Sequence, residues 1–462
     1  MIPPQHNPQT TYWAFVLLGA GTLFPWNAFI TVNEYFSSRF CGSSFQSDYL
    51  SYFSVTFNFF EVCTLILCVI TSLNMVTAPL VVYVGLFILT SLSIFVSSVS
   101  PTSLFIFTIA CLSVVGTCTA LLSGGVFGLA GAFPPEYTQA VMMGQGLAGT
   151  VVSISSIVTA YAAGMPSDYC ESNDDNNDDE CAHYKTDYAA FAYFLVAVFT
   201  LLACIFVYKL LEEMPITKFY RAQNKAGSDK SSSSSGSSSD EENIKTKVNV
   251  IKEPLLDVVM DSSLNTTQST TTTKTITTTL ELIQITILPA SAVAIIFLVT
   301  LAIFPTINSK ILSSQNCAPG SLTSRWSNDL FVPLSFLLYN LFDFVGRVLA
   351  GRVSLELFSG RSLLFWSLSR LIFFPLFLLC NVDGSVVGTP FGDSDIFPTT
   401  FMIVFATSNG FLSSLCMMLG PTMVEPKDQI KCGNVMIFFL SAGLMAGSLL
   451  SFVTLRVSTG EF

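Results

Sequence analysis

One short run of this sequence, Tyr339 to Arg347 (YNLFDFVGR), places charged side chains in an otherwise apolar stretch. Asp343 and Arg347 are four residues apart, so on an α-helix they share one face within ion-pair distance. Asn340 lies about one turn before Asp343 and extends the same polar stripe. A carboxylate, a guanidinium and an amide suit a neutral, hydrogen-bonding solute, whereas the alternative interpretation is a structural ion pair that locks two helices together.

Two further segments place polar side chains within apolar runs. In the first, Pro25 interrupts the helical hydrogen-bond ladder and is followed by Trp26 and Asn27, where freed backbone groups can line a cavity. In the second, Gln145 lies among glycines that allow helices to approach closely. A solute with hydroxyl groups and an aromatic ring would find bonding partners and a stacking surface among these residues. On these grounds alone a hexose would fit as well.

Glu61 and Arg370 are two more ionisable residues inside apolar runs, where a functional role is the default hypothesis. Glu61 has no partner nearby in the sequence. It is either a protonatable group that couples solute movement to a proton gradient or a neutral acid bonded to a neighbouring helix. Arg370 is expected close enough to the inner end of its run to reach the membrane interface, and a structural role is favoured for it.

The composition indicates that these residues lie in a membrane. Hydrophobic residues make up 51% of the chain and charged residues only 11%, against about 25% charged residues in soluble domains. Continuous apolar runs of roughly 20 residues are long enough to cross the hydrocarbon layer as helices, whereas barrel strands would alternate apolar and polar residues. The sequence predicts an all-α polytopic membrane protein with about eleven spans. These are residues 12–33, 48–72, 76–99, 102–132, 138–164, 187–211, 281–305, 326–350, 362–381, 396–420 and 431–456.

Residues 212–280 divide these spans into an N-terminal half of six, residues 1–211, and a C-terminal half of five, residues 281–462. The dividing segment contains a serine run, Ser231 to Ser239, and a threonine-rich stretch, a composition that cannot form a packed core. It is predicted to be a disordered cytoplasmic linker. Its serines beside Asp240 are either substrates of an acid-directed kinase or part of a plain solvated tether.

Lysine and arginine are distributed unequally between alternate loops, and cytoplasmic loops collect these residues. Most of them fall in the inner loops if the N-terminus is cytoplasmic. The prediction is therefore a cytoplasmic N-terminus and, because the number of spans is odd, an extracellular C-terminus. The expected location is the plasma membrane.

The loop between the fifth and sixth spans is acidic and is bracketed by Cys170 and Cys181. An oxidising exterior would permit a disulfide between these two cysteines, and Cys41 with Cys317 is a rival pair on the same side. The sequence shows no metal-ligand spacing, phosphate-binding loop or catalytic nucleophile constellation. No metal, cofactor, enzymatic activity or nucleic-acid partner is expected, and the chain is expected to be a monomer in the lipid bilayer.

Several of these segments, taken in order, resemble the equilibrative nucleoside transporter family. The resemblance covers nearly all the spans, with the long loop between the sixth and seventh. The motifs are GAGTLFPWN in the first span, GVFGLAGAFP (125–134), GQGLAG, FDFVGR (342–347), SRLIFFPLFLLCN and SNGFLSSLCMMLGP (408–421). The resemblance implies a fold similar to the major-facilitator architecture, in which two helical halves rock around a central site.

The resemblance also implies roles for individual residues. Leu23 and Trp26 would pack on a nucleoside, and Gln145 would hydrogen-bond its base. Asp343 with Arg347 would hold the ribose.

Six further positions match by the same resemblance. Cys63 and Leu444 would be apolar wall positions, and Ile30, Pro305, Phe336 and Asn340 would form an outer gate. The resulting hypothesis is a membrane transporter that moves nucleosides, or nucleobases, down their gradient by alternating access. The alternatives are proton-coupled uptake with Glu61 as the titrating group, and a non-transporting membrane receptor or scaffold that signals through the linker.

Overall fold

A computed structural model gives the structure of the chain. It describes residues 7–31, 49–71, 75–94, 99–165, 169–170, 188–233, 269–320 and 324–459, with Pro4 and a few residues between 36 and 45. The described helices are α1 (Pro8–Thr31), α3 (Tyr49–Thr71), α4 (Thr77–Ser93), α5 (Pro101–Gly131), α6 (Pro135–Ala163), α7 (Tyr188–Glu213), α8 (Pro215–Ser233), α9 (Ser269–Ile303), α10 (Phe331–Ala350), α11 (Gly360–Ser369), α12 (Phe373–Leu378), α13 (Ile396–Thr422) and α14 (Gln429–Thr459).

Within the described residues, nine helical segments are long and apolar enough to cross a membrane. They coincide with nine of the predicted spans, and α1 and α4 occupy the positions of the first and third. Apolar side chains cover outward faces of these helices; Phe199 and Phe206 of α7, for example, are 63% and 64% exposed. Such faces are stable in contact with lipid rather than water. The all-α membrane architecture is confirmed, whereas the count of eleven stays a prediction.

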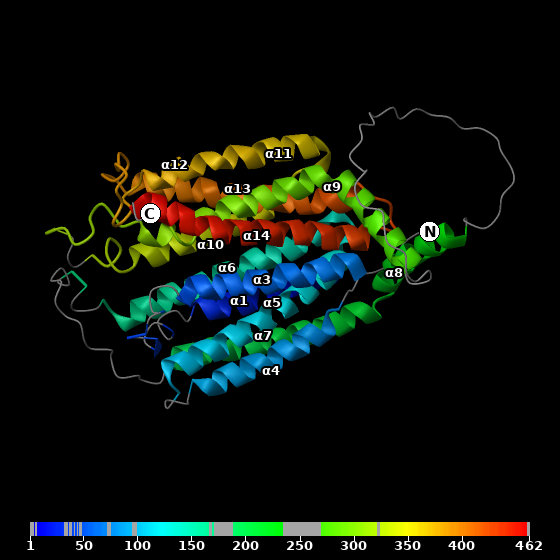
Figure 1. Cartoon of the computed structure of the whole chain (residues 1–462), viewed down its shortest axis with the longest axis horizontal. Helices are drawn as coiled ribbons and strands as arrows, with labels where there is room; N and C mark the ends of the chain where they lie inside the picture. Colours follow the sequence, from blue (N-terminus) through cyan, green and yellow to red (C-terminus); the bar gives the residue numbers. More distant parts are fainter. Residues whose placement is uncertain are drawn as a thin grey trace.

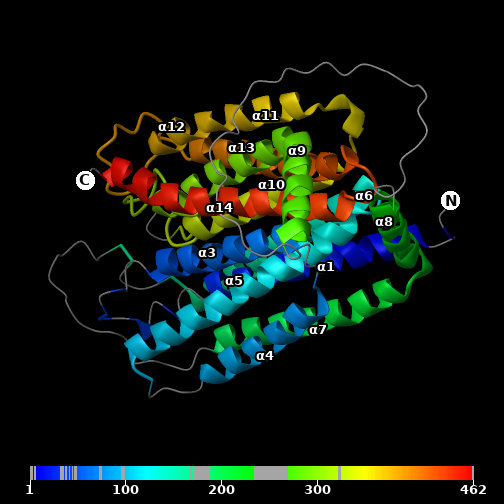
Figure 2. The same cartoon turned by 45° about the vertical axis from the view of Figure 1, so that its right-hand side comes forward.

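The helices form two groups. Helices α1, α3, α4, α5, α6 and α7 pack on one another, as do α9, α10, α11, α13 and α14 (Figure 1). The groups meet where α10 and α13 contact α6, and where α14 contacts α3 and α5. The turned view in Figure 2 shows the same division, with α4 and α7 on the side away from α11. Helix α1 begins and α14 ends at opposite ends of the bundle.

Glycines allow α1 and α6 to pack backbone to backbone. A Cβ atom on Gly144 would lie 1.9 Å from the carbonyl oxygen of Val16, and one on Gly19 would lie 2.1 Å from that of Val141. Neither glycine therefore accepts a side chain without a shift of the helices. This close contact brings Gln145 of α6 next to α1, as the packing interpretation of the glycine-rich segment predicts.

The first part of the predicted linker is helical, contrary to the expectation of disorder. In α8, Ile216 is fully buried, and the Tyr220 ring lies 4.6 Å from the ring of Phe133 at the turn between α5 and α6. The four-residue spacing of Ile216 and Tyr220 gives α8 an apolar face that packs on the bundle. Helix α9 begins at Ser269, so the other boundary is also displaced. Residues 234–268, with most of the serine run, lie outside the described residues.

A disulfide joins the two halves at the end of the bundle where α14 finishes, here called the disulfide end. Cys170, which follows α6, is bonded to Cys317, in the loop between α9 and α10. The predicted pairing of Cys170 with Cys181 is therefore wrong, and so is its rival, Cys41 with Cys317. Sequence spacing does not determine disulfide connectivity, because the partners are brought together by the tertiary fold. Cys41 and Cys181 lie outside the described residues.

Arg325 adds a second contact between the halves at the disulfide end. Its guanidinium donates to the carbonyl oxygens of Ala160 and Tyr161, both at 2.8 Å, at the C-terminal end of α6. Asp329 holds the same guanidinium in an ion pair at 2.6 Å. A cation at this position satisfies free helical carbonyl groups and interacts favourably with the helix dipole. The loop before α10 is thus fastened to α6.

Candidate functional site

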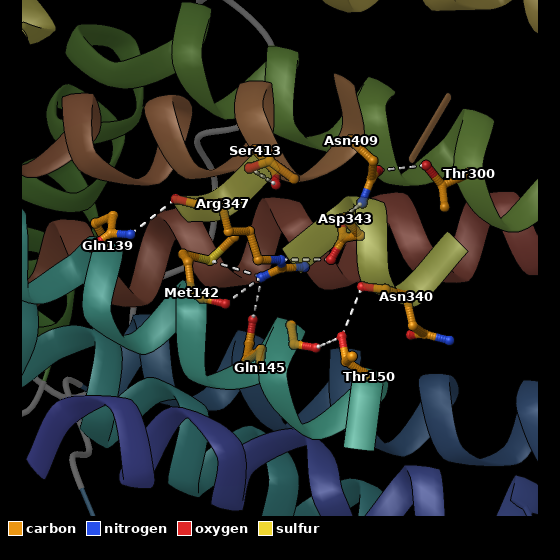
Figure 3. A network of polar contacts seen from close by, with 12 residues as sticks. Gln139, Met142, Gln145, Thr150, Thr300, Asn340, Asp343, Arg347, Asn409 and Ser413 are labelled. Atoms are coloured by element: carbon orange, nitrogen blue, oxygen red, sulfur yellow. Dashed lines mark hydrogen bonds and ion pairs between the residues drawn. The ribbon is translucent and has the colours of Figure 1, made fainter. Parts of the chain in front are cut away.

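The predicted ion pair is formed in the C-terminal half of α10. Arg347 Nε donates to Asp343 Oδ2 at 2.7 Å, and the two residues are 4% and 5% exposed. Their spacing of four residues on one helix explains the contact. Burial of both charges requires further hydrogen bonds, since desolvation otherwise outweighs the attraction within the pair. Figure 3 shows that these bonds come from helices on either side of α10.

Arg347 links α10 to α6 in the other half. Its Nη1 donates to the carbonyl oxygen of Met142 at 2.9 Å and to Gln145 Oε1 at 3.3 Å. The side-chain amide of Gln139 in turn donates to the carbonyl oxygen of Arg347 at 2.9 Å. Both ends of the arginine are therefore bonded to α6. The ion pair lies at the boundary of the two halves (Figure 3).

Asp343 is held from its other side by α13. Asn409 Nδ2 donates to Asp343 Oδ1 at 2.7 Å, and Thr300 of α9 donates to Asn409 Oδ1 at 2.7 Å (Figure 3). Sequence reasoning did not assign a role to Asn409 or Thr300. Asn409 falls inside the motif that begins at Ser408. An amide side chain in an apolar run was the feature that could have marked it as a site residue.

Gln145 connects the ion pair to the aromatic part of the predicted site. Its Nε2 donates to Thr22 Oγ1 of α1 at 3.0 Å. Trp26 follows Thr22 by one helical turn, is half-buried, and stacks on Phe57 of α3 with ring centroids 4.6 Å apart. Leu23 is also half-buried on α1. The structure therefore connects Asp343, Arg347 and Gln145 directly, and places Trp26 one turn from their partner Thr22.

The predicted gate residues lie toward the disulfide end, where α1 and α9 finish and α10 begins. Asn340 Nδ2 donates to Ser153 Oγ of α6 at 2.7 Å. The ring of Phe336 lies 4.7 Å from that of Phe304, and the exposed Pro305 follows Phe304 directly. The side chain of Ile30 lies outside the described residues.

Two predicted wall positions lie apart from the hydrogen-bonded network. Cys63 on α3 is exposed, and Leu444 on α14 is half-buried against the hydrophobic core. Arg370, expected at the membrane interface, is instead 2% exposed between α11 and α12. Hydropathy locates a span but leaves the depth of a residue near its end undetermined, which accounts for the difference.

Glu61 lies on α3 at the contact with α14. It is 4% exposed, and its Oε1 accepts a hydrogen bond from Ser441 Oγ at 3.0 Å. Its other carboxyl oxygen has no hydrogen-bond partner among the described residues. The interpretation of Glu61 as an acid bonded to a neighbouring helix requires such a bond, and it is present. Glu61 is also one helical turn from Phe57, the residue on which Trp26 stacks.

A cavity of about 220 Å³ lies at the end of the bundle opposite the disulfide. Its lining includes Phe133, Tyr220 and Pro421, from the α5–α6 turn, α8 and α13, but neither Asp343 nor Arg347. The ion pair is buried away from this cavity. Within the described part of the chain, no group of three His, Cys, Asp or Glu side chains is placed to hold a metal ion.

A bundle of membrane-length helices in two groups, with a buried polar network where they meet, defines a polytopic α-helical membrane protein. Its architecture is similar to the major-facilitator proton:xylose symporter XylE, with a TM-score of 0.50 and 12% identity over 96% of this chain and 86% of that one. A bacterial homologue of the iron transporter ferroportin gives a TM-score of 0.50 at 11% identity, over 98% and 96% of the two chains. These likenesses concern the fold alone.

Sequence relatives identify the family. Residues 109–456 match the profile of the nucleoside transporter family. Equilibrative nucleoside transporter 1 of Rattus norvegicus is 30% identical, with 97% of this chain and 98% of the relative covered. Equilibrative nucleoside transporter 2 of Homo sapiens is 29% identical over 95% of each, and equilibrative nucleotide transporter 1 of Arabidopsis thaliana is 25% identical over 97% and 86%. The chain belongs to the nucleoside transporter family, as its motifs predicted.

Proposed function

We propose that this protein carries nucleosides across the membrane down their concentration gradient by alternating access. The observation that carries the proposal is the buried network of Asp343, Arg347 and Gln145, which joins α10 of one half to α6 of the other. Any motion that separates the halves at this level opens the Arg347–Gln145 contact. A solute that replaces this contact then binds to both halves, which is the requirement for a site around which they rock.

The residue types in the network match the parts of a nucleoside. Asp343 accepts hydrogen bonds from ribose hydroxyl groups, and Arg347 donates to the same hydroxyl oxygens. Gln145 has both a donor and an acceptor for the edge of a base, and Trp26 offers its ring for stacking. Leu23 packs beside the base on α1, with Cys63 and Leu444 as more distant apolar wall positions. The adjacent acid and base offset one another, so a neutral solute is favoured over a strongly charged one.

We propose that contacts between the halves close the site on the side of the disulfide end in the described conformation. Arg325 donates to the carbonyl groups at the end of α6, and Asn340 donates to Ser153, earlier in the same helix. We assign the outer gate to this region, with Ile30, Pro305 and Phe336 as further gate positions. Opening toward this side breaks the Asn340 and Arg325 contacts.

A second candidate function is proton-coupled uptake, and the environment of Glu61 favours its consideration. This carboxyl group is buried at a contact between the halves and, among the described residues, accepts one hydrogen bond, from Ser441. Separation of α3 from α14 would expose it to water, which allows proton exchange in one conformation and not in the other. Proton-coupled carriage predicts that uptake follows a pH gradient, whereas gradient-independent flux supports the first proposal.

Several properties of the whole chain belong to the same proposal. We place the N-terminus in the cytoplasm and the C-terminus outside, in the plasma membrane, and the protein functions as a monomer. Residues 212–280 separate the halves on the cytoplasmic side, and a kinase acts on the serines near Asp240. The distribution of loop lysine and arginine supports this orientation.

Counterflow into proteoliposomes tests the substrate and the mechanism together. Purified protein is reconstituted, the vesicles are loaded with unlabelled adenosine, and the entry of labelled adenosine, uridine, adenine or AMP is measured. The proposal predicts transient accumulation of labelled nucleosides without a pH gradient, and little or none of the charged AMP. Absence of nucleoside counterflow, with linker-deleted protein equally inactive, would instead support a receptor or scaffold.

A further inference from the structure

Arg370 is a buried cation without a carboxylate in direct contact. It begins a 3-10 turn between α11 and α12. Its Nη1 donates to the carbonyl oxygen of Phe405 at 2.9 Å and to the hydroxyl group of Ser408, and its guanidinium carbon lies 4.7 Å from the centre of the Phe405 ring. No ion pair among the described residues includes Arg370. A charge buried in this way is costly, which indicates a purpose for its position.

Arg370 reaches the ion pair on α10 through one intervening residue. Its Nη2 donates to Thr300 Oγ1 at 3.0 Å and, over a longer 3.4 Å, to Asn409 Oδ1. The other end of the Asn409 amide donates to Asp343 Oδ1 at 2.7 Å. The chain Arg370–Asn409–Asp343–Arg347 thus places one carboxylate between two guanidinium groups, and all four residues are at least 95% buried.

The order of charges along this chain fixes the orientation of the Asn409 amide. A carboxylate only accepts hydrogen bonds and a guanidinium only donates them. With Nδ2 toward Asp343 and Oδ1 toward Arg370, both contacts are favourable. A half-turn of the amide would bring oxygen against oxygen at Asp343 and donor against donor at Arg370. The Thr300 hydroxyl cannot enforce this choice alone, since it accepts as well as donates.

We propose that Arg370 is a positioning residue that sets the selectivity of this transporter for hydroxyl groups on the sugar. It orients Asn409, and Asn409 holds the Asp343 carboxylate against Arg347. Each carboxylate oxygen has two acceptor positions. Asn409 occupies one position on Oδ1 and Arg347 occupies one on Oδ2. One acceptor position remains on each oxygen, and these two contacts fix its direction. The inference rests on the proposed function, because it deepens the assignment of Asp343 to sugar recognition.

A purely structural role for Arg370 makes a different prediction. The residue also fastens the α11–α12 turn to α13 and α9, so its loss can reduce the amount of folded protein. Such a loss lowers the maximal rate for every substrate by the same factor. A loss of positioning at Asp343 instead raises KM for substrates that use the hydroxyl contact and leaves the others unchanged.

The test compares adenosine with 2′,3′-dideoxyadenosine, which lacks the 2′- and 3′-hydroxyl groups and keeps the 5′-hydroxyl group, as substrates of the full chain in proteoliposomes. For Arg370→Gln we expect the KM of adenosine to rise about tenfold, the loss of a well-placed hydrogen bond to a charged group. The KM of the dideoxy analogue should change by less than about twofold. Arg361→Gln is the matched control, since Arg361 is exposed in the first turn of α11; it should leave both KM values unchanged.

Thr300→Val provides a second variant in case Arg370→Gln does not fold. It removes the hydroxyl group between Arg370 and Asn409, and we expect about a threefold increase in KM for adenosine alone. Equal changes for the two substrates, or no change in either variant, would overturn the inference. Asp343→Ala distinguishes failure of the Arg370 inference from failure of the sugar assignment. If Asp343→Ala removes the difference in KM between the two substrates while Arg370→Gln and Thr300→Val keep it, only the role of Arg370 is refuted. If Asp343→Ala keeps the discrimination, the sugar assignment itself fails.

Discussion

Among the described residues, two carboxyl groups are buried where the halves of this protein meet, and their surroundings differ sharply. Asp343 of α10 bonds to Arg347 and to Asn409, both at 2.7 Å. Glu61 of α3 accepts one hydrogen bond, from Ser441 at 3.0 Å, and its second oxygen has no hydrogen-bond partner among the described residues. The two residues are equally hidden, at 5% and 4% exposure, so burial alone does not distinguish them.

The difference shows what a buried acid needs in order to serve as a binding group. A buried charge persists where it is paired and hydrogen-bonded. Asp343 meets this condition and keeps acceptor positions for a solute. Glu61 accepts a hydrogen bond from the Ser441 hydroxyl group and is in no ion pair among the described residues. This environment suits a contact between two helices better than a solute-binding site. We therefore assign nucleoside binding to Asp343 and keep Glu61 as the residue whose removal tests proton coupling.

The largest effect is expected from Asp343→Ala. This change leaves Arg347 buried without its counter-charge, at a cost of about 3–5 kcal/mol, and removes the acceptor for the sugar. Uptake of radiolabelled adenosine, normalised to surface abundance, should fall at least about a hundredfold. Asp383→Asn, at an exposed loop position, is the control and should leave uptake unchanged. Wild-type uptake by Asp343→Ala would refute the assignment.

A smaller effect is expected from glycine substitutions in two helix contacts, one beside Asp343 and one beside Glu61. A Cβ atom on Gly410 would lie 1.9 Å from the Asp343 carbonyl oxygen, and one on Gly116 would lie 2.4 Å from the Phe57 carbonyl oxygen and 3.3 Å from Glu61 N. Alanine at either position forces the helices apart, at roughly 1–3 kcal/mol of stability.

Both glycine variants should therefore melt earlier than Gly85→Ala, since nothing lies within 4 Å of a Cβ atom on Gly85. Only Gly410→Ala, beside Asp343, should also raise the KM for adenosine, by about tenfold. Thermal melting and uptake kinetics on the same preparations measure both quantities. An equal increase in KM for Gly116→Ala would place Glu61 and Asp343 in one functional unit and remove the contrast between them.

Local features of the sequence predicted much of this site. The Asp343–Arg347 contact depends on a four-residue spacing within one helix, and the spans depend on the length of apolar runs, so both are readable from short windows. The close approach of another helix at the glycines around Gln145 was predicted for the same reason. These features require no knowledge of which helices are neighbours.

The remaining features depend on neighbours that are distant in the chain. Asn409 of α13 bonds to Asp343, and Thr300 of α9 bonds to Asn409. Hydropathy does not show which helices meet. Arg370 was expected at the interface from its position in the apolar run. Its burial instead follows from the turn between α11 and α12. The Cys170–Cys317 disulfide joins loops 147 residues apart, and spacing had favoured a nearer partner. Motif resemblance supplied the proposed roles of Gln145 and Trp26 that composition left open.

The smallest effect is expected from Glu61→Gln. Glutamine keeps an acceptor for Ser441, so downhill adenosine uptake at equal external and internal pH should remain within about twofold of wild type. Neither protein should respond to an imposed pH gradient in proteoliposomes. If a gradient stimulates the wild type and Glu61→Gln loses that stimulation, then Glu61 couples transport to protons and the simpler mechanism is wrong.

Equilibrium binding tests the central assignment most directly, because it removes folding yield and conformational cycling from the comparison. Purified wild-type protein and Asp343→Asn, which keeps the shape of the side chain and loses its charge, are titrated with labelled adenosine and with labelled 2′,3′-dideoxyadenosine. We predict that Asp343→Asn weakens adenosine binding by about a hundredfold and dideoxyadenosine binding by less than about threefold. Equal affinities of the two proteins for adenosine would contradict the placement of the sugar at the α10 ion pair.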